Sequence, residues 1–216
     1  MSYIVAIDGP AGAGKSTVAK ELAKALNYTY IDSGAMYRAI TLKIIKNNVD
    51  INNITDVLDL LKTTDISFKG RKMLIDNKDV TKEIRSSKVD RLVSKVSTIP
   101  EVRQILIANQ RKISIDKDIV MDGRDIGTVV FPDATVKIFL TASVEERAKR
   151  RTEENLDKGI TNSYEEVLSE IINRDSTDSH RDISPLRQAE DAILIDTTNK
   201  TVKGVVDEIL SIMGVN

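Results

Sequence analysis

Apolar and polar residues alternate along the chain in blocks that favour a layered α/β fold. Short apolar runs rich in β-branched residues, typical of buried strands, occur at 3–7, 28–31, 118–122, 135–140 and 192–196. Apolar residues at helical spacing predict helices over 16–26, 35–46, 54–62, 100–114 and 202–213. Because most of these strands and helices alternate, we expect a parallel sheet of about five strands with helices on both faces.

The pattern changes between residues 50 and 99. Two short runs, Asp65–Phe68 and Lys72–Ile75, are joined by Lys69-Gly70-Arg71 and predict a β-hairpin. Asp76–Asp79 predicts a further turn, and Thr81–Ser97 predicts a helix after a short irregular lead. Small antiparallel strands do not belong in a doubly wound core, so this segment is interpreted as an insertion. Where an insertion of this size lies beside a ligand site, it typically closes over or selects a second substrate.

A pair of arginine-rich helices is predicted near the C-terminal end. Ser143 is expected to cap the first helix and Ser163 to begin the second, with a glycine turn between them. Each helix carries charged residues on a single face: Arg147, Arg150 and Arg151 on the first, and Arg174, Asp178 and Arg181 on the second. A mobile lid and a solvated hairpin held by ion pairs both fit this pattern.

Composition narrows the class of protein. The chain of 216 residues suits one α/β domain with a sizeable insertion. A net charge of −1 gives no general attraction to nucleic acid or anionic membrane. Cysteine is absent, which excludes disulfides and thiolate chemistry. No apolar stretch has the length of a membrane span and no signal peptide is seen, so we expect a soluble, cytoplasmic protein.

The most specific short motif is Gly9-Pro10-Ala11-Gly12-Ala13-Gly14-Lys15-Ser16, a P-loop between a predicted strand and a predicted helix. Its glycines let the backbone curl around a phosphate, and the N–H groups at the helix start attract the anion. Lys15 would reach the β- and γ-phosphates, and the Ser16 hydroxyl would ligate Mg²⁺. With both flanks correct, this motif predicts binding of a nucleoside triphosphate.

Polar residues also follow two other predicted strands. Tyr37 and Arg38 lie in the first turn of the helix after 28–31, near the edge of a parallel sheet where ligands bind. An apolar strand ends at Asp122, which resembles a Walker B carboxylate acting on Mg²⁺ directly or through water. Arg124 and Asp125 follow at once, in the segment 123–128, which is expected to be a loop rich in glycine and charge. Structural roles for these residues, as a packed Tyr, a solvated Arg or a turn Asp, remain open at this point.

Three longer segments resemble bacterial cytidylate kinases, nucleoside monophosphate kinases with the P-loop fold. They are Ile7–Ser16, Asp32–Arg38 and Asp122–Ala134, joined by Arg174-Asp175 and Pro185-Leu186. The resemblance covers nearly the whole chain. It implies a single kinase domain with a core of 1–50, 99–142 and 190–216, an inserted monophosphate-binding subdomain at about 51–98, and a helical lid at about 143–189. It further implies transfer of the γ-phosphoryl group of ATP to CMP or dCMP, with Mg²⁺.

The same resemblance assigns roles to residues. ATP would be bound by Gly9, Pro10, Ala11, Gly12, Ala13, Gly14, Lys15, Ser16 and Thr17, the last offering a second hydroxyl near Mg²⁺. The acceptor phosphate would be held by Arg38, Arg103 and Arg124, the cytosine read by Ser33, Ser94 and Asp125 beside Tyr37, and the sugar contacted by Asp178, Arg174 and Arg181. Catalysis would use Lys15, Arg124, Arg150 and Arg151, and the metal Ser16 and Asp122. Cytosine carries an amino donor where uracil carries an acceptor, so Asp125 could separate the two bases.

Other classes of protein were weighed against this interpretation. A P-loop kinase for another acceptor keeps most of the features above. A GTPase switch would need an Asn-Lys-x-Asp motif, and Asn77-Lys78-Asp79-Val80 fails at its fourth position. A nucleic-acid-binding module is disfavoured by the balanced charge and by 4% aromatic residues. His180, the one histidine, is given no acid–base role. We expect a monomer that binds its small-molecule substrates and neither nucleic acid nor membrane.

Overall fold

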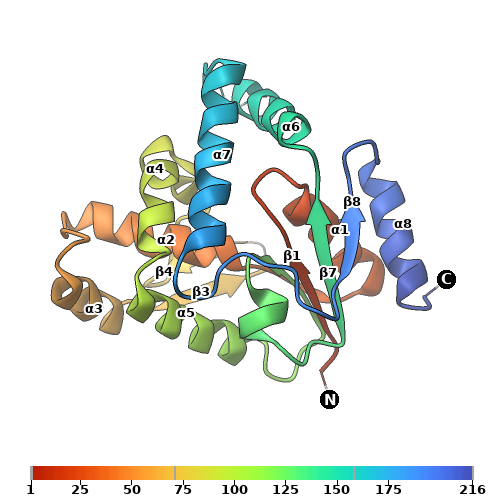
Figure 1. Cartoon of the computed structure of the whole chain (residues 1–216). Coiled ribbons are helices and arrows are strands. Elements are labelled where there is room, and N and C mark those ends of the chain that lie inside the picture. Colours follow the sequence, from red (N-terminus) through yellow and green to blue (C-terminus); the bar gives the residue numbers. More distant parts are fainter. Residues whose placement is uncertain (1, 71, 158, 216) are drawn as a thin grey trace. The chain divides into compact units, whose positions relative to one another are not determined.

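The computed structural model describes residues 2–70, 72–157 and 159–215. The chain forms two compact units: Met1–Ile31 together with Asp116–Asn216, and Asp32–Ile115. Each unit has its own sheet (Figure 1). Each also has its own hydrophobic core. The second unit contains the predicted insertion at 51–98 and extends beyond it at both ends.

The first unit is built on a five-stranded parallel sheet with the strand order β2-β6-β1-β7-β8. The strands are β1 (Ile4–Asp8), β2 (Thr29–Asp32), β6 (Ile119–Gly123), β7 (Val136–Thr141) and β8 (Ile193–Asp196). The central strand β1 pairs in parallel with β6 and β7, so Ile7 lies beside both Asp122 and Ile138. The predicted parallel sheet is confirmed, and the loops that leave β1 and β6 start at the same edge of it.

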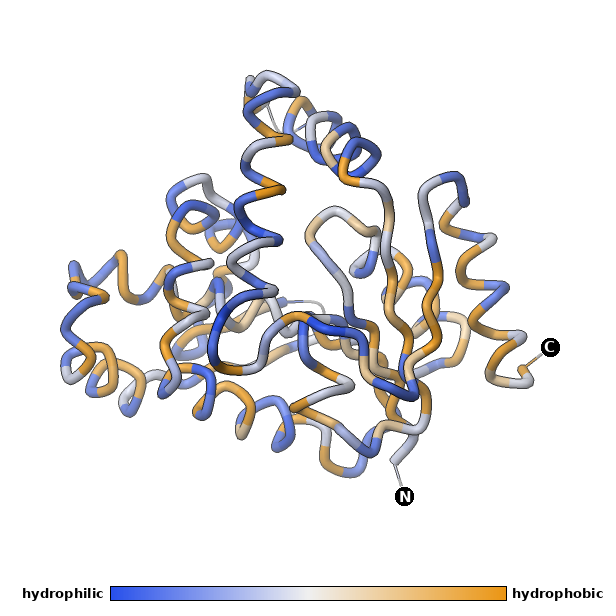
Figure 2. Tube along the Cα trace, viewed as in Figure 1, coloured by the Kyte–Doolittle hydropathy of each residue, from blue (hydrophilic) through white to orange (hydrophobic). Residues whose placement is uncertain are grey.

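Helices α1 (Lys15–Leu26) and α8 (Val202–Ile212) pack against each other and share one core with this sheet. Val18 and Leu22 of α1 and Val205 and Ile209 of α8 are buried there with Ile7. Figure 2 shows the apolar character of the central strands, which are buried as a strand covered on both faces must be. The burial of these apolar side chains fixes the strand ends that carry the polar residues.

Helices α6 (Val144–Asp157) and α7 (Tyr164–His180) pack against each other in the same unit, around a small apolar cluster of Ala148, Val167 and Ile171. The Ser143 hydroxyl accepts a hydrogen bond from the N–H of Glu146, as predicted. Ser163 forms a full capping box with Glu166, so α7 begins where the sequence predicts.

The second unit contains α2 (Ser33–Lys46), α3 (Ile54–Lys62), β3 (Ile66–Lys69), β4 (Lys72–Ile75), β5 (Lys78–Asp79), the 3₁₀ turn η1 (Glu83–Arg85), α4 (Ser87–Val96) and α5 (Pro100–Ile113). Its three strands form an antiparallel sheet, which confirms the predicted hairpin. Met36 and Ile40 of α2 are buried against apolar residues of α4 and β4. Pro100 is the first residue of α5, where its missing N–H costs nothing.

Two local predictions were wrong in part. The segment 123–128 was expected to be a loop, but Gly123 pairs with Asp8 as the last residue of β6. Ile126–Val130 then form one turn of π-helix, named η2. Asp76–Asp79 was expected to be a turn only, yet its last two residues form β5 because they pair with β4. The extension of β6 to Gly123 and the strand β5 come from pairing with neighbouring strands, which the local pattern does not show. The π turn is closed by local hydrogen bonds from Val130 to Asp125 and from Phe131 to Ile126. In the described residues no helix is long and apolar enough to cross a membrane.

Candidate active site

The loop Gly9–Gly14 joins β1 to α1 and has the backbone that a phosphate cradle needs. Gly12 and Gly14 adopt positive φ, and Gly14 is the residue before the first turn of α1. A Cβ placed on Gly9 would lie 1.9 Å from the carbonyl oxygen of Leu140 in β7. Only glycine fits this close approach of the loop to the sheet. The loop is thereby held at the start of α1, and the backbone N–H groups of a helix start stabilise an anion.

Lys15 is buried at the start of α1, and its ammonium donates a hydrogen bond of 2.6 Å to the carbonyl oxygen of Pro10. Burial holds the pKa of Lys15 well below its ordinary value, the nearby charge of Arg124 lowers that pKa further, and Asp122 opposes both effects. A negatively charged ligand would reverse this balance. The position therefore favours binding of an anion such as a phosphate.

Asp122 lies at the end of β6, and two hydroxyl groups donate to its carboxylate. Ser16 Oγ lies 2.8 Å from Oδ2, and Tyr30 Oη lies 2.7 Å from Oδ1. The predicted neighbours Ser16 and Asp122 thus meet, although 106 residues separate them in sequence. Within the described residues, no group of three or more His, Cys, Asp and Glu could hold a metal by itself. One hydroxyl and one carboxylate do fit Mg²⁺, which usually takes few protein ligands and completes its shell with phosphate and water.

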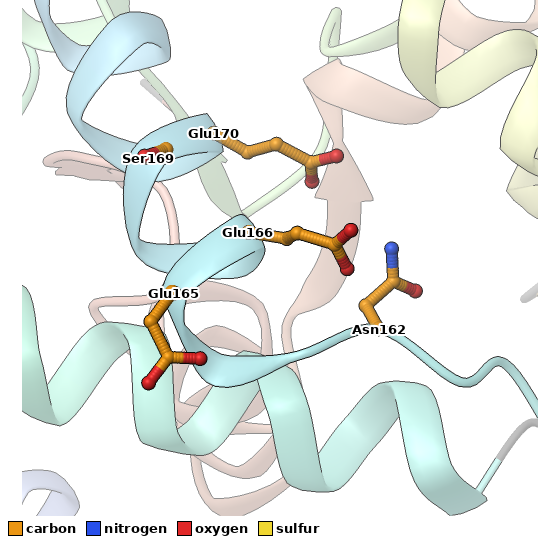
Figure 3. A pocket seen from close by; sticks show the side chains of 5 residues that line it. All are labelled: Asn162, Glu165, Glu166, Ser169 and Glu170. Carbon is orange, nitrogen blue, oxygen red and sulfur yellow. The ribbon is translucent and has the colours of Figure 1, made fainter.

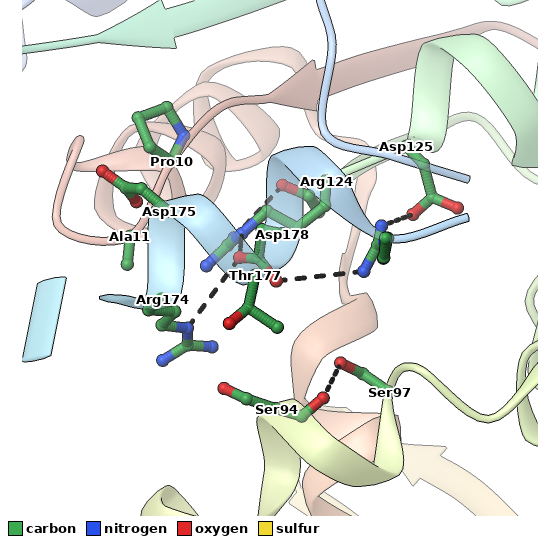
Figure 4. A network of polar contacts seen from close by, with 12 residues as sticks. Pro10, Ala11, Ser94, Ser97, Arg124, Asp125, Arg174, Asp175, Thr177 and Asp178 are labelled. Atoms are coloured by element: carbon green, nitrogen blue, oxygen red, sulfur yellow. Dashed lines mark hydrogen bonds and ion pairs between the residues drawn. The ribbon is translucent and has the colours of Figure 1, made fainter. Parts of the chain in front are cut away.

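A buried cluster of charges follows β6 and includes the C-terminal half of α7 (Figure 4). Arg124 donates through Nε to Asp178 Oδ2 at 2.8 Å. Arg174 and Arg181 each have a nitrogen 3.9 Å from the same carboxylate. Burial alone would raise the pKa of Asp178, but Arg124 and Arg174 outweigh it and the pKa is lowered. Asp178 therefore stays ionised and holds these arginines together.

Asp125 is buried beside this cluster, with Oδ1 3.8 Å from a guanidinium nitrogen of Arg181. Its backbone carbonyl accepts hydrogen bonds from the N–H groups of Val129 and Val130, which belong to the π turn. Asp125 is thereby fixed both at its backbone and beside Arg181. A buried carboxylate in this position can accept hydrogen bonds from a ligand amino group.

The three arginines of α6 go to different partners. Arg147 is buried and bonds the carbonyl oxygen of Ala11 in the phosphate loop at 3.1 Å and Asp175 of α7 at 2.6 Å. Arg150 donates to the hydroxyl and carbonyl oxygen of Thr197, the residue after β8. Arg151 pairs with Glu154 on the helix surface. Arg147 thus bonds the phosphate loop, and Arg150 lies near it, because one of its guanidinium nitrogens is 3.9 Å from the position of a Cβ on Gly14.

Most of the remaining predicted residues belong to the second unit, and Thr17 and His180 belong to the first. Arg38 pairs with Asp90 at 2.5 Å, and Arg103 donates to the carbonyl oxygen of Ser97 while its guanidinium lies 5.4 Å from the centre of the Tyr37 ring. Ser33 is buried in the first turn of α2, and Ser94 accepts a bond from the Ser97 hydroxyl through its backbone carbonyl. Thr17 is exposed in α1, and His180 is exposed at the end of α7, bonded to Ser176 O.

Two residues near the site, Tyr30 and Asp8, were given no role from the sequence, and Arg147 was singled out only as part of the arginine face of a possible lid. Asp8 ends β1, is 5% exposed, and accepts hydrogen bonds from the N–H groups of Ile126 (2.8 Å) and Gly127 (2.7 Å). Burial raises the pKa of Asp8 to about 6; the two N–H groups and Lys15 oppose the rise, and Asp125 adds to it. Its place directly before the glycine loop was the available signal, but its bonding partners lie 118 and 119 residues away.

Figure 3 shows an open depression at the start of α7, lined by Asn162, Glu165, Glu166, Ser169 and Glu170. Three carboxylates there would repel phosphates. We do not assign the substrate site to this depression.

Comparisons with known proteins agree with the geometry. Residues 5–214 match the family described as Cytidylate kinase. The protein named cytidylate kinase from Caldanaerobacter subterraneus subsp. tengcongensis is 57% identical over 95% of this chain and 92% of its own length. That from Carboxydothermus hydrogenoformans is 55% identical over 97% of this chain and 96% of its own. A shikimate kinase structure from Acinetobacter baumannii, 16% identical with a TM-score of 0.50, covers 99% of this chain and 93% of its own and shows a shared fold.

The raised pKa of Asp8 predicts a distinct pH dependence of stability. The native state holds this proton up to about pH 6 and the unfolded chain only to about 3.8, so the contribution of Asp8 to stability is lost as pH rises through that window. Relative to Asp8→Asn, the wild type should lose about 2 kcal/mol of unfolding free energy between pH 4 and pH 7. Urea denaturation at several pH values measures the difference. Stability curves of the two proteins that stay parallel across this range would contradict the assignment.

Proposed function

Because the chain belongs to the cytidylate kinase family, we propose how its residues divide the transfer of the γ-phosphoryl group of ATP to CMP or dCMP, which yields ADP and CDP or dCDP. Two polyanions must approach each other in this reaction, so positive charge has to surround both. The observation that carries the proposal is a group of four cations, Lys15, Arg124, Arg174 and Arg181. Lys15 is buried, and the three arginines surround the buried carboxylate of Asp178.

ATP is bound, in this proposal, by the loop from Gly9 to Thr17. The backbone N–H groups at the start of α1 donate to the β-phosphate, as at other helix N-termini. The Lys15 ammonium leaves the Pro10 carbonyl and binds phosphate oxygens, where its charge is matched. This step also removes the cause of its low pKa, because the phosphates supply the negative charge that burial lacks.

We propose that Ser16 and Asp122 hold the Mg²⁺ that accompanies ATP, directly or through water. Bound there, Mg²⁺ neutralises charge on the β- and γ-phosphates. The hydroxyl and the carboxylate are already 2.8 Å apart, and Tyr30 fixes the other carboxylate oxygen. Tyr30 therefore sets the orientation of Asp122.

In this proposal Arg124 binds the acceptor phosphate of CMP. Asp178 accepts hydrogen bonds from the sugar hydroxyls, with Arg174 and Arg181 beside it. A guanidinium offers paired donors that match phosphate oxygens. The ion pair between Arg124 and Asp178 keeps the Arg124 guanidinium charged and oriented before substrate arrives. The other predicted CMP contacts, Ser33, Tyr37, Arg38, Ser94 and Arg103, come from the second unit and keep that role as predictions from sequence resemblance.

Asp125 reads the base in this proposal. Its carboxylate accepts from the cytosine amino group, whereas uracil would direct a carbonyl oxygen at it. A buried carboxylate facing a carbonyl is strongly unfavourable, so uridine substrates should be rejected.

Arg150 and Arg151 are proposed to contact the transferring phosphoryl group from the lid. Both have partners in this structure, Thr197 and Glu154, that they would exchange for phosphate oxygens. We retain the proposed division into core, insertion and lid, a monomeric state, cytoplasmic location and binding of small molecules alone.

A panel of acceptors tests the function. ADP formation from Mg²⁺-ATP is measured with CMP, dCMP, UMP, AMP, GMP and dTMP offered singly. We expect rapid turnover confined largely to CMP and dCMP. Rapid turnover with another acceptor would overturn the base assignment but keep the kinase, and ADP release that no acceptor accelerates would overturn the transfer reaction.

Replacing Asp125 tests the base contact. In Asp125→Ala the amino group of cytosine loses its acceptor and uracil loses its repulsion, so the ratio of kcat/KM for CMP over UMP should fall by roughly a hundredfold or more. Asp133→Ala, an exposed carboxylate in the turn before β7, is the matched control and should keep the wild-type ratio. Unchanged selectivity in Asp125→Ala would contradict the role.

A further inference from the structure

Asp8 lies between two parts of the site, the phosphate loop and the segment that carries Arg124 and Asp125. By sequence it directly precedes Gly9, the first glycine of the phosphate loop. Its side chain bonds Ile126 and Gly127, the residues directly after Arg124 and Asp125. Asp8 thus links the segment that would bind the donor to the segment that would bind the acceptor.

The two hydrogen bonds restrain the acceptor segment in a specific way. Each oxygen of one carboxylate accepts from one of two successive N–H groups, which fixes both the position and the rotation of the peptide between them. Gly127 has no side chain to separate the partners: a Cβ there would lie 3.1 Å from Lys137 Cδ and 3.4 Å from Asp8 Oδ2. Lys137 lies close to Gly127 and is itself bonded to Asp191. The segment after Asp125 is therefore hydrogen-bonded to Asp8 and packed against Lys137.

Burying a carboxylate at this position is energetically unfavourable unless both of its oxygens accept hydrogen bonds. Asparagine would fill the same volume without a charge, but it offers one acceptor and one donor to a pair of N–H donors. One of the two N–H groups would then face another donor. The geometry requires an acceptor on both sides, which only an ionised Asp supplies at this side-chain length.

We propose that Asp8 is a positioning residue for the acceptor site, fixing Arg124 and Asp125 through its bonds to the N–H groups of Ile126 and Gly127. The inference rests on the roles proposed for those two residues. It predicts a defect that is larger for CMP than for ATP, because the hydrogen bonds described for the Asp8 side chain go to the acceptor segment and not to the N–H groups of the phosphate loop. A purely structural role would instead lower stability and impair the use of ATP and CMP alike.

The test is Asp8→Asn, with steady-state kinetics for ATP and for CMP and a thermal melt. We expect KM for CMP to rise about tenfold or more, the preference for CMP over UMP to fall, and KM for ATP to stay within about threefold of the wild-type value. The matched control is Asp118→Asn. Asp118 also accepts a backbone N–H bond, from Tyr3 at the other end of β1, and its variant should show wild-type kinetics.

Equal changes in KM for both substrates, or no change in either, would overturn the proposal. Should Asp8→Asn fail to fold, hydrogen exchange in the wild-type protein decides: the Ile126 and Gly127 amides should be strongly protected, and rapid exchange of both would overturn the proposal. Failure of the proposed function itself is distinguishable, because Asp125→Ala would then leave CMP selectivity unchanged whatever Asp8→Asn does.

Discussion

Compensation of buried charge at the edge of the parallel sheet is the constraint on which the site depends. Lys15 and Asp178 are nearly removed from water and the Arg124 side chain is 18% exposed, so each charge would be costly there alone. Asp178 keeps Arg124 charged. Lys15, by contrast, is described with one hydrogen-bond acceptor, the uncharged carbonyl oxygen of Pro10. The positive charge of Lys15 is therefore left to be compensated by a negatively charged ligand. That is the electrostatic requirement for binding phosphates, and the fold supplies it before any substrate arrives.

The fold meets this requirement because strand ends of one sheet coincide. The register of β1 with β6 sets Asp8 beside Gly123 and Ile7 beside Asp122. The glycine loop and the Arg124–Asp125 segment consequently leave the sheet at neighbouring points. The apolar core beneath, with Val5 and Val120 fully buried, holds that register. Helix α7 adds Asp178, and its capping box fixes where the helix begins.

Much of this could be predicted from the sequence, because it depends on local pattern. The β-branched runs, the glycine motif and the serine caps each act within a few residues, and the structure confirms the sheet and the helix starts they predict. The family was also predicted, and the match over residues 5–214 confirms it. The division into core, insertion and lid, and the individual site roles, remain predictions.

The rest was missed because it depends on pairing between distant segments. Helical spacing places Arg147, Arg150 and Arg151 together, but it does not say that Arg147 will bond Ala11 while Arg150 bonds Thr197. Asp8 and Tyr30 look like ordinary strand residues until their partners are known. The extension of β6 to Gly123 has the same origin, since it follows from pairing with β1.

The most direct measurement is of CMP use by Arg124→Ala, with Arg187→Ala, an exposed arginine of the same unit, as control. Arg174 and Arg181 still face Asp178 in this variant, so its carboxylate keeps positive neighbours. If Arg124 binds the acceptor phosphate, kcat/KM for CMP should fall by roughly a hundredfold or more while calorimetric binding of Mg²⁺-ATP stays near the wild-type value. A value within about threefold of wild type would contradict the account.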